Sequence, residues 1–175
     1  MPMSLTFPNA ALRALALLPA SFAAAVHAQA PLPQPNLALL DNGPVTAFAR
    51  QPDGGTIIAG QFTSVDGLPR NGLARVRPDG AIDPDWNPAP DAAVDALAVD
   101  ANGNVYAGGT FQSIGGAARA YLAKLAGGGS GQADATWNPS PDSSVTALAL
   151  DGANALYVGG WFENIGGQPR PRLAK

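Results

Sequence analysis

The chain has 175 residues and a formal net charge of −3 at pH 7, with 13 acidic against 10 basic side chains. A mildly acidic chain without a basic run has no electrostatic footprint for nucleic acid or anionic lipid, so neither is expected as a partner. It contains no cysteine and one histidine, which excludes disulfides and removes most of the usual ligands for zinc, copper or haem.

The first 30 residues have the order of a secretory signal peptide. One positive charge, Arg13, precedes acid-free apolar stretches at residues 14–18 and 21–26, and small residues follow at 28–30. A charged start, an apolar middle and an A-x-A end are typical of an export signal. We predict cleavage after Ala30 and a mature chain that is secreted or periplasmic.

A short membrane anchor is the alternative for this segment. Its apolar run is interrupted by Pro19 and is shorter than the roughly 20 residues that span a bilayer, so we expect no membrane span in the mature chain. The single histidine, His27, lies inside the predicted signal. A mature chain without His or Cys has no Ser/His or Cys/His nucleophile–base pair, so we expect that it is not an enzyme of those classes.

Three near-copies of one segment follow a Pro-rich linker at residues 31–44. They begin at Val45, Val94 and Val145, so the first offset is 49 residues and the second is 51. Self-similarity at a period of about 20–50 residues indicates a repeat architecture, in which one unit cannot bury its apolar surface alone. The predicted repeats are 45–93, 94–144 and a truncated 145–175.

Each repeat has the pattern of short strands joined by tight turns, with no helical period. In the first repeat the strands centre on residues 45–49, 56–60 and 73–76, separated by turns rich in Asp, Asn and Gly. Glycine ends each second strand, which permits a bulge or a close approach of backbone. The first strands are apolar on both faces, so we expect neighbouring sheets to cover both. Three or four antiparallel strands in about 50 residues are typical of a β-propeller blade.

The segment GQFTSVDGLPRNGLARVRPDGAIDPDWNP, residues 60–88, resembles the delta-60 repeat, a bacterial β-propeller repeat family of unknown function. The likeness recurs over residues 109–139 and 160–175, with the glycines, the Phe and the Arg in register. It covers essentially everything after Pro44. The resemblance implies an all-β propeller and no particular activity.

The repeats number about two and a half, whereas a propeller has about 4–8 blades. We therefore expect an incomplete propeller, as in a fragment of a longer propeller protein. The alternative is a short unit that completes its ring by self-association, since copies of one chain can close a symmetric ring.

Three arginines share one repeat position just after a Gly-containing turn, namely Arg70, Arg119 and Arg170. A ring of guanidinium groups could bind an anionic glycan or a phosphate, because the planar fork suits bidentate recognition. The alternative is an ion pair within the fold, for example with Asp83 or Asp134. Recurrence in every repeat favours this structural role.

The tryptophans divide into two kinds. Trp86 and Trp137 each precede Asn-Pro at one repeat position, which favours packing anchors with a locally bonded indole N–H over sugar-stacking platforms. Trp161 breaks the repeat, because Gln61 and Thr110 stand at its position. It is therefore the better candidate for a surface contact.

Acidic side chains offer weaker candidates. Asp79, Asp83 and Asp85 could hold Ca²⁺, which takes oxygen ligands, but the next repeat does not keep the cluster, so turn-forming acids are the favoured interpretation. We expect no cofactor. The predicted function is an exported, non-catalytic propeller module that is structural or binds a glycan or protein ligand. The alternative is an extracellular polysaccharide hydrolase or lyase that uses a pair of carboxylates. Acids such as Asp66, Asp95 and Glu163 are present, but none recurs in all three repeats and no pair is singled out.

Overall fold

The computed structural model describes residues 43–175, which form strands, turns and loops. The predicted signal peptide at 1–30 and the predicted linker up to residue 42 lie outside the described residues. The described strands are β1 (Val45–Arg50), β2 (Thr56–Gly60), β3 (Ser64–Val65), β4 (Leu68–Pro69), β5 (Leu73–Val76), β6 (Val94–Val99), β7 (Val105–Gly109), β8 (Ser113–Ile114), β9 (Ala117–Ala118), β10 (Leu122–Leu125), β11 (Val145–Leu150), β12 (Leu156–Gly160), β13 (Asn164–Ile165), β14 (Gln168–Pro169) and β15 (Leu173–Ala174).

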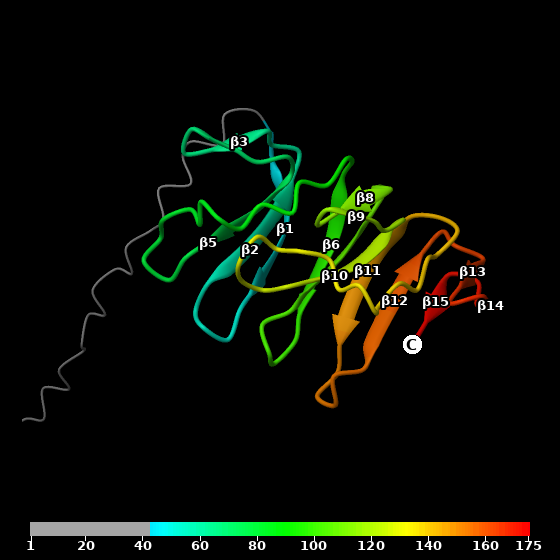
Figure 1. Cartoon of the computed structure of the whole chain (residues 1–175). Coiled ribbons are helices and arrows are strands. Elements are labelled where there is room, and N and C mark those ends of the chain that lie inside the picture. Colours follow the sequence, from blue (N-terminus) through cyan, green and yellow to red (C-terminus); the bar gives the residue numbers. More distant parts are fainter. Residues whose placement is uncertain (1–42) are drawn as a thin grey trace, which may run out of the picture. The chain divides into compact units, whose positions relative to one another are not determined.

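The longer strands form three antiparallel sheets, one from each repeat (Figure 1). Their strand orders are β1-β2-β5 in the first sheet, β6-β7-β10 in the second and β11-β12-β15 in the third. The remaining strands form the hairpins β3–β4, β8–β9 and β13–β14. The predicted all-β, propeller-like repeat is confirmed, and the described sheets do not close into a ring.

A bulge interrupts the first strand of every sheet at the same place. In β1 the register shifts between Val45 and Ala47, and β6 and β11 shift at the equivalent positions. Gly60 permits the close approach, because a Cβ there would lie 2.1 Å from the carbonyl oxygen of Pro44. The glycines that end β7 and β12 face the same kind of contact at 2.1 and 2.2 Å. The bulge expected from the glycines is therefore present in all three sheets.

Each small hairpin turns through two residues with positive φ. In β3–β4 these are Asp66 (φ 51°) and Gly67 (φ 73°), and in the other two hairpins both are glycine. Two left-handed residues give the turn whose twist matches that of antiparallel strands. Each hairpin adds one buried apolar side chain to the core, namely Val65, Ile114 and Ile165.

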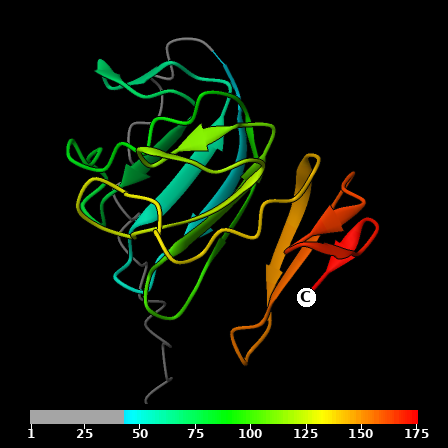
Figure 2. The ribbon, with the colours of Figure 1, turned by 45° about the vertical axis from the view of Figure 1, so that its right-hand side comes forward.

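The second sheet packs between the other two, since β6 contacts both β1 and β11. The two views of the ribbon show the three sheets following one another in chain order (Figures 1 and 2). One apolar cluster joins Ile57 and Leu73 of the first sheet to Val105 of the second. Another joins Leu122 of the second sheet to Val158 of the third. The second sheet therefore packs against the first sheet with one face and against the third sheet with the other.

Neighbouring sheets cover both faces of the second sheet only, so the expectation that both faces of the first strands are covered is wrong for β1. Phe48 on β1 is 73% exposed, and Leu173 on β15 is 66% exposed. Both lie on faces that point away from the second sheet, where no further sheet packs among residues 43–175. Leu97 occupies the position of Phe48 in the second sheet, and it packs against the first cluster.

Candidate functional site

Arg70 follows the β3–β4 hairpin and is buried, with 4% of its surface exposed. Its Nη1 donates to the carbonyl oxygen of Pro69 at 2.7 Å, and its Nη2 donates to those of Asp83 and Pro84 at 2.8 and 2.9 Å. Burial lowers the pKa of Arg70, and the charge of Asp83 opposes this shift. The guanidinium thus ties the segment after β5 to the hairpin and is not available to a ligand.

Arg119 is half-buried and repeats this arrangement in the second sheet. Its Nη2 donates to the carbonyl oxygen of Asp134 at 2.8 Å. The predicted ion pairs with Asp83 and Asp134 are wrong in one respect: Arg70 and Arg119 bond to the backbone carbonyls of these aspartates and not to their carboxylates. The carboxylates face other cations instead: Asp83 lies 2.6 Å from Arg75, and Asp134 lies 3.5 Å from Lys124.

Arg170 has the same position in the third repeat and a different environment. It is exposed, and its guanidinium makes no hydrogen bond or ion pair with another residue of the described chain. The structure therefore separates the three predicted site arginines into two bound side chains and one accessible side chain.

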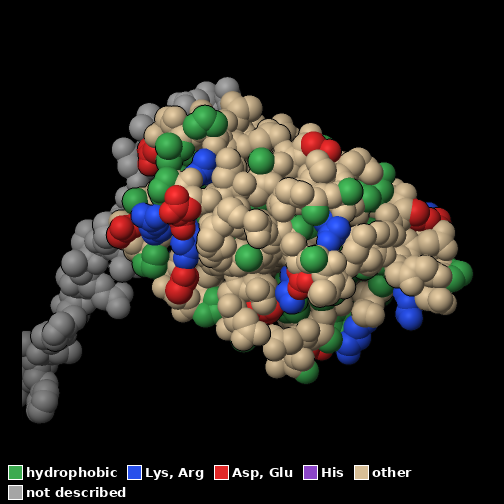
Figure 3. All heavy atoms as spheres, viewed as in Figure 1, with side chains coloured by type: hydrophobic (Ala, Val, Ile, Leu, Met, Phe, Trp, Pro, Cys, Tyr) green, Lys and Arg blue, Asp and Glu red, His purple; other side chains and the backbone are tan. Residues whose placement is uncertain are grey.

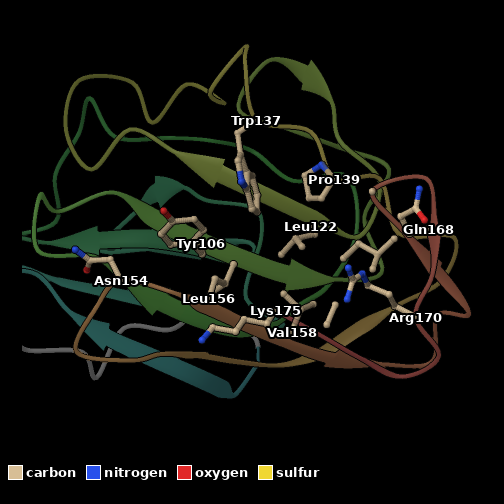
Figure 4. Close-up of a pocket in the computed structure, with 13 residues that line it drawn as sticks. Tyr106, Leu122, Trp137, Pro139, Asn154, Leu156, Val158, Gln168, Arg170 and Lys175 are labelled. Carbon is tan, nitrogen blue, oxygen red and sulfur yellow. The ribbon is translucent and has the colours of Figure 1, made fainter.

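Arg170 lines a groove of about 460 Å³ between the second and third sheets (Figure 4). Apolar walls come from β7, β10 and β12, and the segment before β11 contributes an indole ring. Cationic side chains lie toward the β13–β14 hairpin and the β15 edge. We call this feature the Arg170 groove; its lining includes Tyr106, Leu122, Trp137, Leu156, Val158 and Lys175.

Trp86 and Trp137 share a repeat position but differ in burial. Trp86 is fully buried, and its indole N–H donates to the carbonyl oxygen of Ala126 at 2.9 Å. The predicted packing anchor is confirmed at this position, but the bond is not local, since its partner lies 40 residues away. Trp137 is half-buried in the Arg170 groove, where it meets Tyr106 edge-on with 5.4 Å between ring centroids.

Trp161, the fourth predicted site residue, lies outside the groove lining. Its side chain is 63% exposed. The guanidinium of Arg172 lies 5.6 Å from its ring centroid, and the same guanidinium lies 4.0 Å from a carboxylate oxygen of Glu163. The ring therefore has one face against a cation, and its role as a ligand contact stays a prediction.

Two of the three acids considered for Ca²⁺, Asp79 and Asp83, make hydrogen bonds within the fold. Asp79 accepts the N–H of Ala81 at 3.0 Å, as a turn-forming acid does. Burial alone would raise the pKa of Asp83, but hydrogen bonds from Arg75 and Arg77 outweigh it and lower the pKa. Over the described part of the chain, no group of three or more His, Cys, Asp or Glu side chains is placed to hold a metal ion.

The acids named for a hydrolase or lyase belong to three different repeats. Asp66 is exposed in the β3–β4 turn, Asp95 is exposed on β6, and Glu163 is exposed just before β13. Glu163 faces Arg172. No hydrogen bond within residues 43–175 joins any two of these three carboxylates.

Lys175 is the groove residue that sequence reasoning missed. Its Nζ lies 3.7 Å from a carboxylate oxygen of Asp151 and 5.0 Å from the ring centroid of Tyr157. Its repeat position was a usable signal, because Lys124 occupies it in the second repeat and Arg75 in the first. On the face that the space-filling view shows, acidic and basic side chains lie next to one another at several places (Figure 3).

Comparison with known proteins gives one family match. The model of a β-propeller domain of unknown function, DUF5122, matches residues 51–85 and 154–175. No curated protein and no solved structure gave a match. A search of the described residues for a helix of membrane-spanning length and apolarity found none. The matched segments and the three stacked sheets support a β-propeller repeat family and identify the fold as a propeller-like stack of blades.

Proposed function

We propose that this chain is an exported, non-catalytic module of delta-60-type propeller repeats that binds a glycan or protein ligand in the Arg170 groove. The delta-60 assignment rests on the recurring Gly-x-Phe, Arg and Trp-Asn-Pro residues of the repeats. The family match, which covers a domain of unknown function, is consistent with a module that has no activity of its own.

One observation carries the binding role. The guanidinium of Arg170 is exposed in an apolar-walled groove, whereas Arg70 and Arg119 at the same repeat position are bound to backbone carbonyls. Concave, largely apolar sites with a few polar groups are the usual form of ligand sites in proteins. Within the Arg170 groove, Arg170 and Lys175 supply donors, and Trp137 supplies an aromatic surface.

A pull-down on immobilised glycans, run together with a reducing-sugar assay on the same polysaccharides, tests this role. We expect retention of the full chain on at least one glycan or protein surface without release of sugar. Retention should fall with Arg170→Ala and persist with the matched variant Arg50→Ala, since Arg50 is also an exposed arginine but ends β1 and is not part of the groove lining. Sugar release would instead support the hydrolase or lyase.

Export is the second part of the proposal, and the sequence of residues 1–30 supports it. Expression of the full chain in a Gram-negative host, followed by fractionation and intact mass, tests it directly. We expect a periplasmic or secreted product that begins at Pro31. A cytoplasmic product that keeps residues 1–30 would contradict export without bearing on the groove.

A further inference from the structure

Two pairs of asparagine followed by glycine lie within residues 43–175. Asn71–Gly72 directly precedes β5, and Asn102–Gly103 lies in the turn between β6 and β7. Asparagine is among the thermally labile residues, because the main-chain nitrogen that follows it can attack the carbon of its side-chain amide and release ammonia. A following glycine has no Cβ to obstruct this attack. Each pair is therefore a chemical candidate for deamidation, and the fold decides which one reacts.

The first pair, Asn71–Gly72, is held in place by the fold. The side-chain nitrogen of Asn71 donates to the carbonyl oxygen of Pro90. Gly72 is buried, and its N–H donates to the carbonyl oxygens of Phe62 and Arg70 at 2.8 and 3.1 Å. Attack on the Asn71 side chain would require these hydrogen bonds to break and a buried nitrogen to reach water. The folded chain therefore protects this pair.

The second pair, Asn102–Gly103, is much less constrained. Asn102 is exposed, and its side-chain amide makes no hydrogen bond with another residue of the described chain. It also lines a hollow of about 270 Å³ between the turns of the first and second repeats, which gives water access to the side chain. The N–H of Gly103 donates to the carbonyl oxygen of Asp100 at 2.9 Å. Opening of this single turn frees the nitrogen, and exposed turns open at a low cost in free energy.

The turn that contains Asn102 is also a contact between two repeats. The side-chain nitrogen of the buried Gln51 donates to the carbonyl oxygens of Gly103 and Gly127 at 3.0 and 2.9 Å. The Nε of Arg75 donates to the Gln51 side-chain oxygen at 2.7 Å, so the amide is held at both ends. A Cβ at Gly127 would lie 1.9 Å from the Gly103 carbonyl oxygen, which shows how closely the two turns approach. A change in the main chain at Gly103 therefore reaches the first repeat directly.

We propose that Asn102 is a site of spontaneous deamidation and that the isoaspartate formed there loosens the contact between the first and second repeats. The Gly103 nitrogen loses its proton to hydroxide and bonds to Cγ of Asn102. The bond from Cγ to the amide nitrogen breaks, and ammonia leaves after taking a proton from water. Water then opens the succinimide ring at either carbonyl, which gives isoaspartate or aspartate. One water is consumed for each ammonia released, and no oxidant or reductant takes part. This inference goes beyond the proposed binding function and does not rest on it.

The two products differ in their effect on this contact. Isoaspartate adds a methylene group to the main chain just before Gly103, whose carbonyl lies against Gly127 and accepts from Gln51. A displaced carbonyl leaves the buried Gln51 amide without one of its acceptors, and an unpaired buried polar group is costly. Aspartate keeps the length of the main chain, so it should leave the contact intact. We therefore expect a loss of stability from isoaspartate alone.

Ageing of the full chain in mildly alkaline buffer tests the inference. Peptide mapping by mass spectrometry follows both asparagine–glycine pairs, and enzymatic methylation of isoaspartate identifies the product. In the folded chain we expect Asn102 to react about tenfold faster than Asn71, because less of the fold must open to free its glycine nitrogen. In urea the two rates should become similar. Asn102→Gln is the matched control, since it keeps an amide but places it one carbon further from the main chain, and its peptide should stay unmodified.

Urea unfolding of the aged chain tests the effect on the contact. The aged chain should unfold at a lower urea concentration than the fresh chain, whereas aged Asn102→Gln and fresh Asn102→Asp should keep the midpoint of the unaltered chain. Equal reaction of Asn71 and Asn102 in the folded chain would overturn the inference, as would an Asn102 that stays unmodified. Isoaspartate at this position with an unchanged urea midpoint would contradict the loosened contact. None of these results depends on the Arg170 groove, so the binding function is tested separately.

Discussion

Arg119 and Arg170 occupy one position in adjacent repeats, but their environments differ. Arg119 donates to the carbonyl of Asp134 in its own repeat, whereas Arg170 points into a groove without such a partner in the described chain. The same contrast separates Trp86 from Trp137, one fully buried and the other half-buried. A repeat position therefore fixes where a side chain lies, while the segments packed against it decide whether it supports the fold or remains free to bind.

The two tryptophans should give the largest measurable difference. Trp86→Ala should lower the free energy of unfolding by about 4 kcal/mol, because it leaves a cavity in the first interface and an unpaired Ala126 carbonyl. Trp137→Ala should cost about 1–2 kcal/mol, since the ring is only half-buried. Urea unfolding followed by far-ultraviolet circular dichroism measures both. Equal losses would show that the two interfaces are equivalent in solution.

The arginines should give the next largest difference. Arg70→Ala should lower the free energy of unfolding by about 3 kcal/mol, because the carbonyls of Asp83 and Pro84 lose their donor in a buried place. Arg170→Ala should leave the unfolding midpoint in urea unchanged. A matching loss in Arg170→Ala would mean that its guanidinium is bound within the folded chain, which would contradict the accessible groove.

Sequence alone predicted most of the fold, because each structural position occurs in up to three repeats and the residues found there can be compared. Glycine ends β2, β7 and β12, at positions where a Cβ would meet a backbone oxygen. Because this glycine recurs in all three repeats, the sequence predicted the bulge. The strands and turns were predicted for the same reason. The uncovered face of the first sheet was not predicted: Phe48 and Leu97 share a position, and only the packing of a second sheet distinguishes them.

The site was harder to predict because it depends on contacts distant in sequence. The indole of Trp86 bonds to Ala126, and no pattern around Trp86 identifies that partner. The sequence grouped Arg170 with its two counterparts and favoured a structural role for all three. The structure distinguishes Arg170, since its surroundings come from the second and third repeats together.

A pair of aspartates extends the comparison to pH. Asp100 is buried in the second repeat, and burial would raise its pKa, but hydrogen bonds from Asn104 and Asn102 outweigh burial and lower it from its ordinary value of 3.8. A lowered folded-state pKa stabilises the fold above the unfolded value, and this stabilisation is lost as pH falls through the folded value. Asp100→Asn should therefore cost about 1 kcal/mol at pH 7 and progressively less below about pH 4.

Asp151 is the matched control for this titration, because it occupies the position of Asp100 in the third repeat. Its pKa is also lowered, by hydrogen bonds from the N–H groups of Ala155 and Ala153. In place of the side-chain donor that Asn104 gives Asp100 at 2.8 Å, it has the more distant Lys175 at 3.7 Å. Urea midpoints measured from pH 7 to pH 3 should therefore shift less in Asp151→Asn. A larger shift in Asp151→Asn would reverse the expected order of the two repeats.

The smallest expected effect concerns the lysines of the same two repeats. Lys124 lies 3.5 Å from Asp134, and both side chains are partly covered, so Lys124→Gln should cost about 0.5 kcal/mol at low salt. Lys175→Gln should leave the urea midpoint unchanged, because its contact with Asp151 is more exposed. Equal losses in Lys124→Gln and Lys175→Gln would mean that the two ion pairs are equivalent in solution.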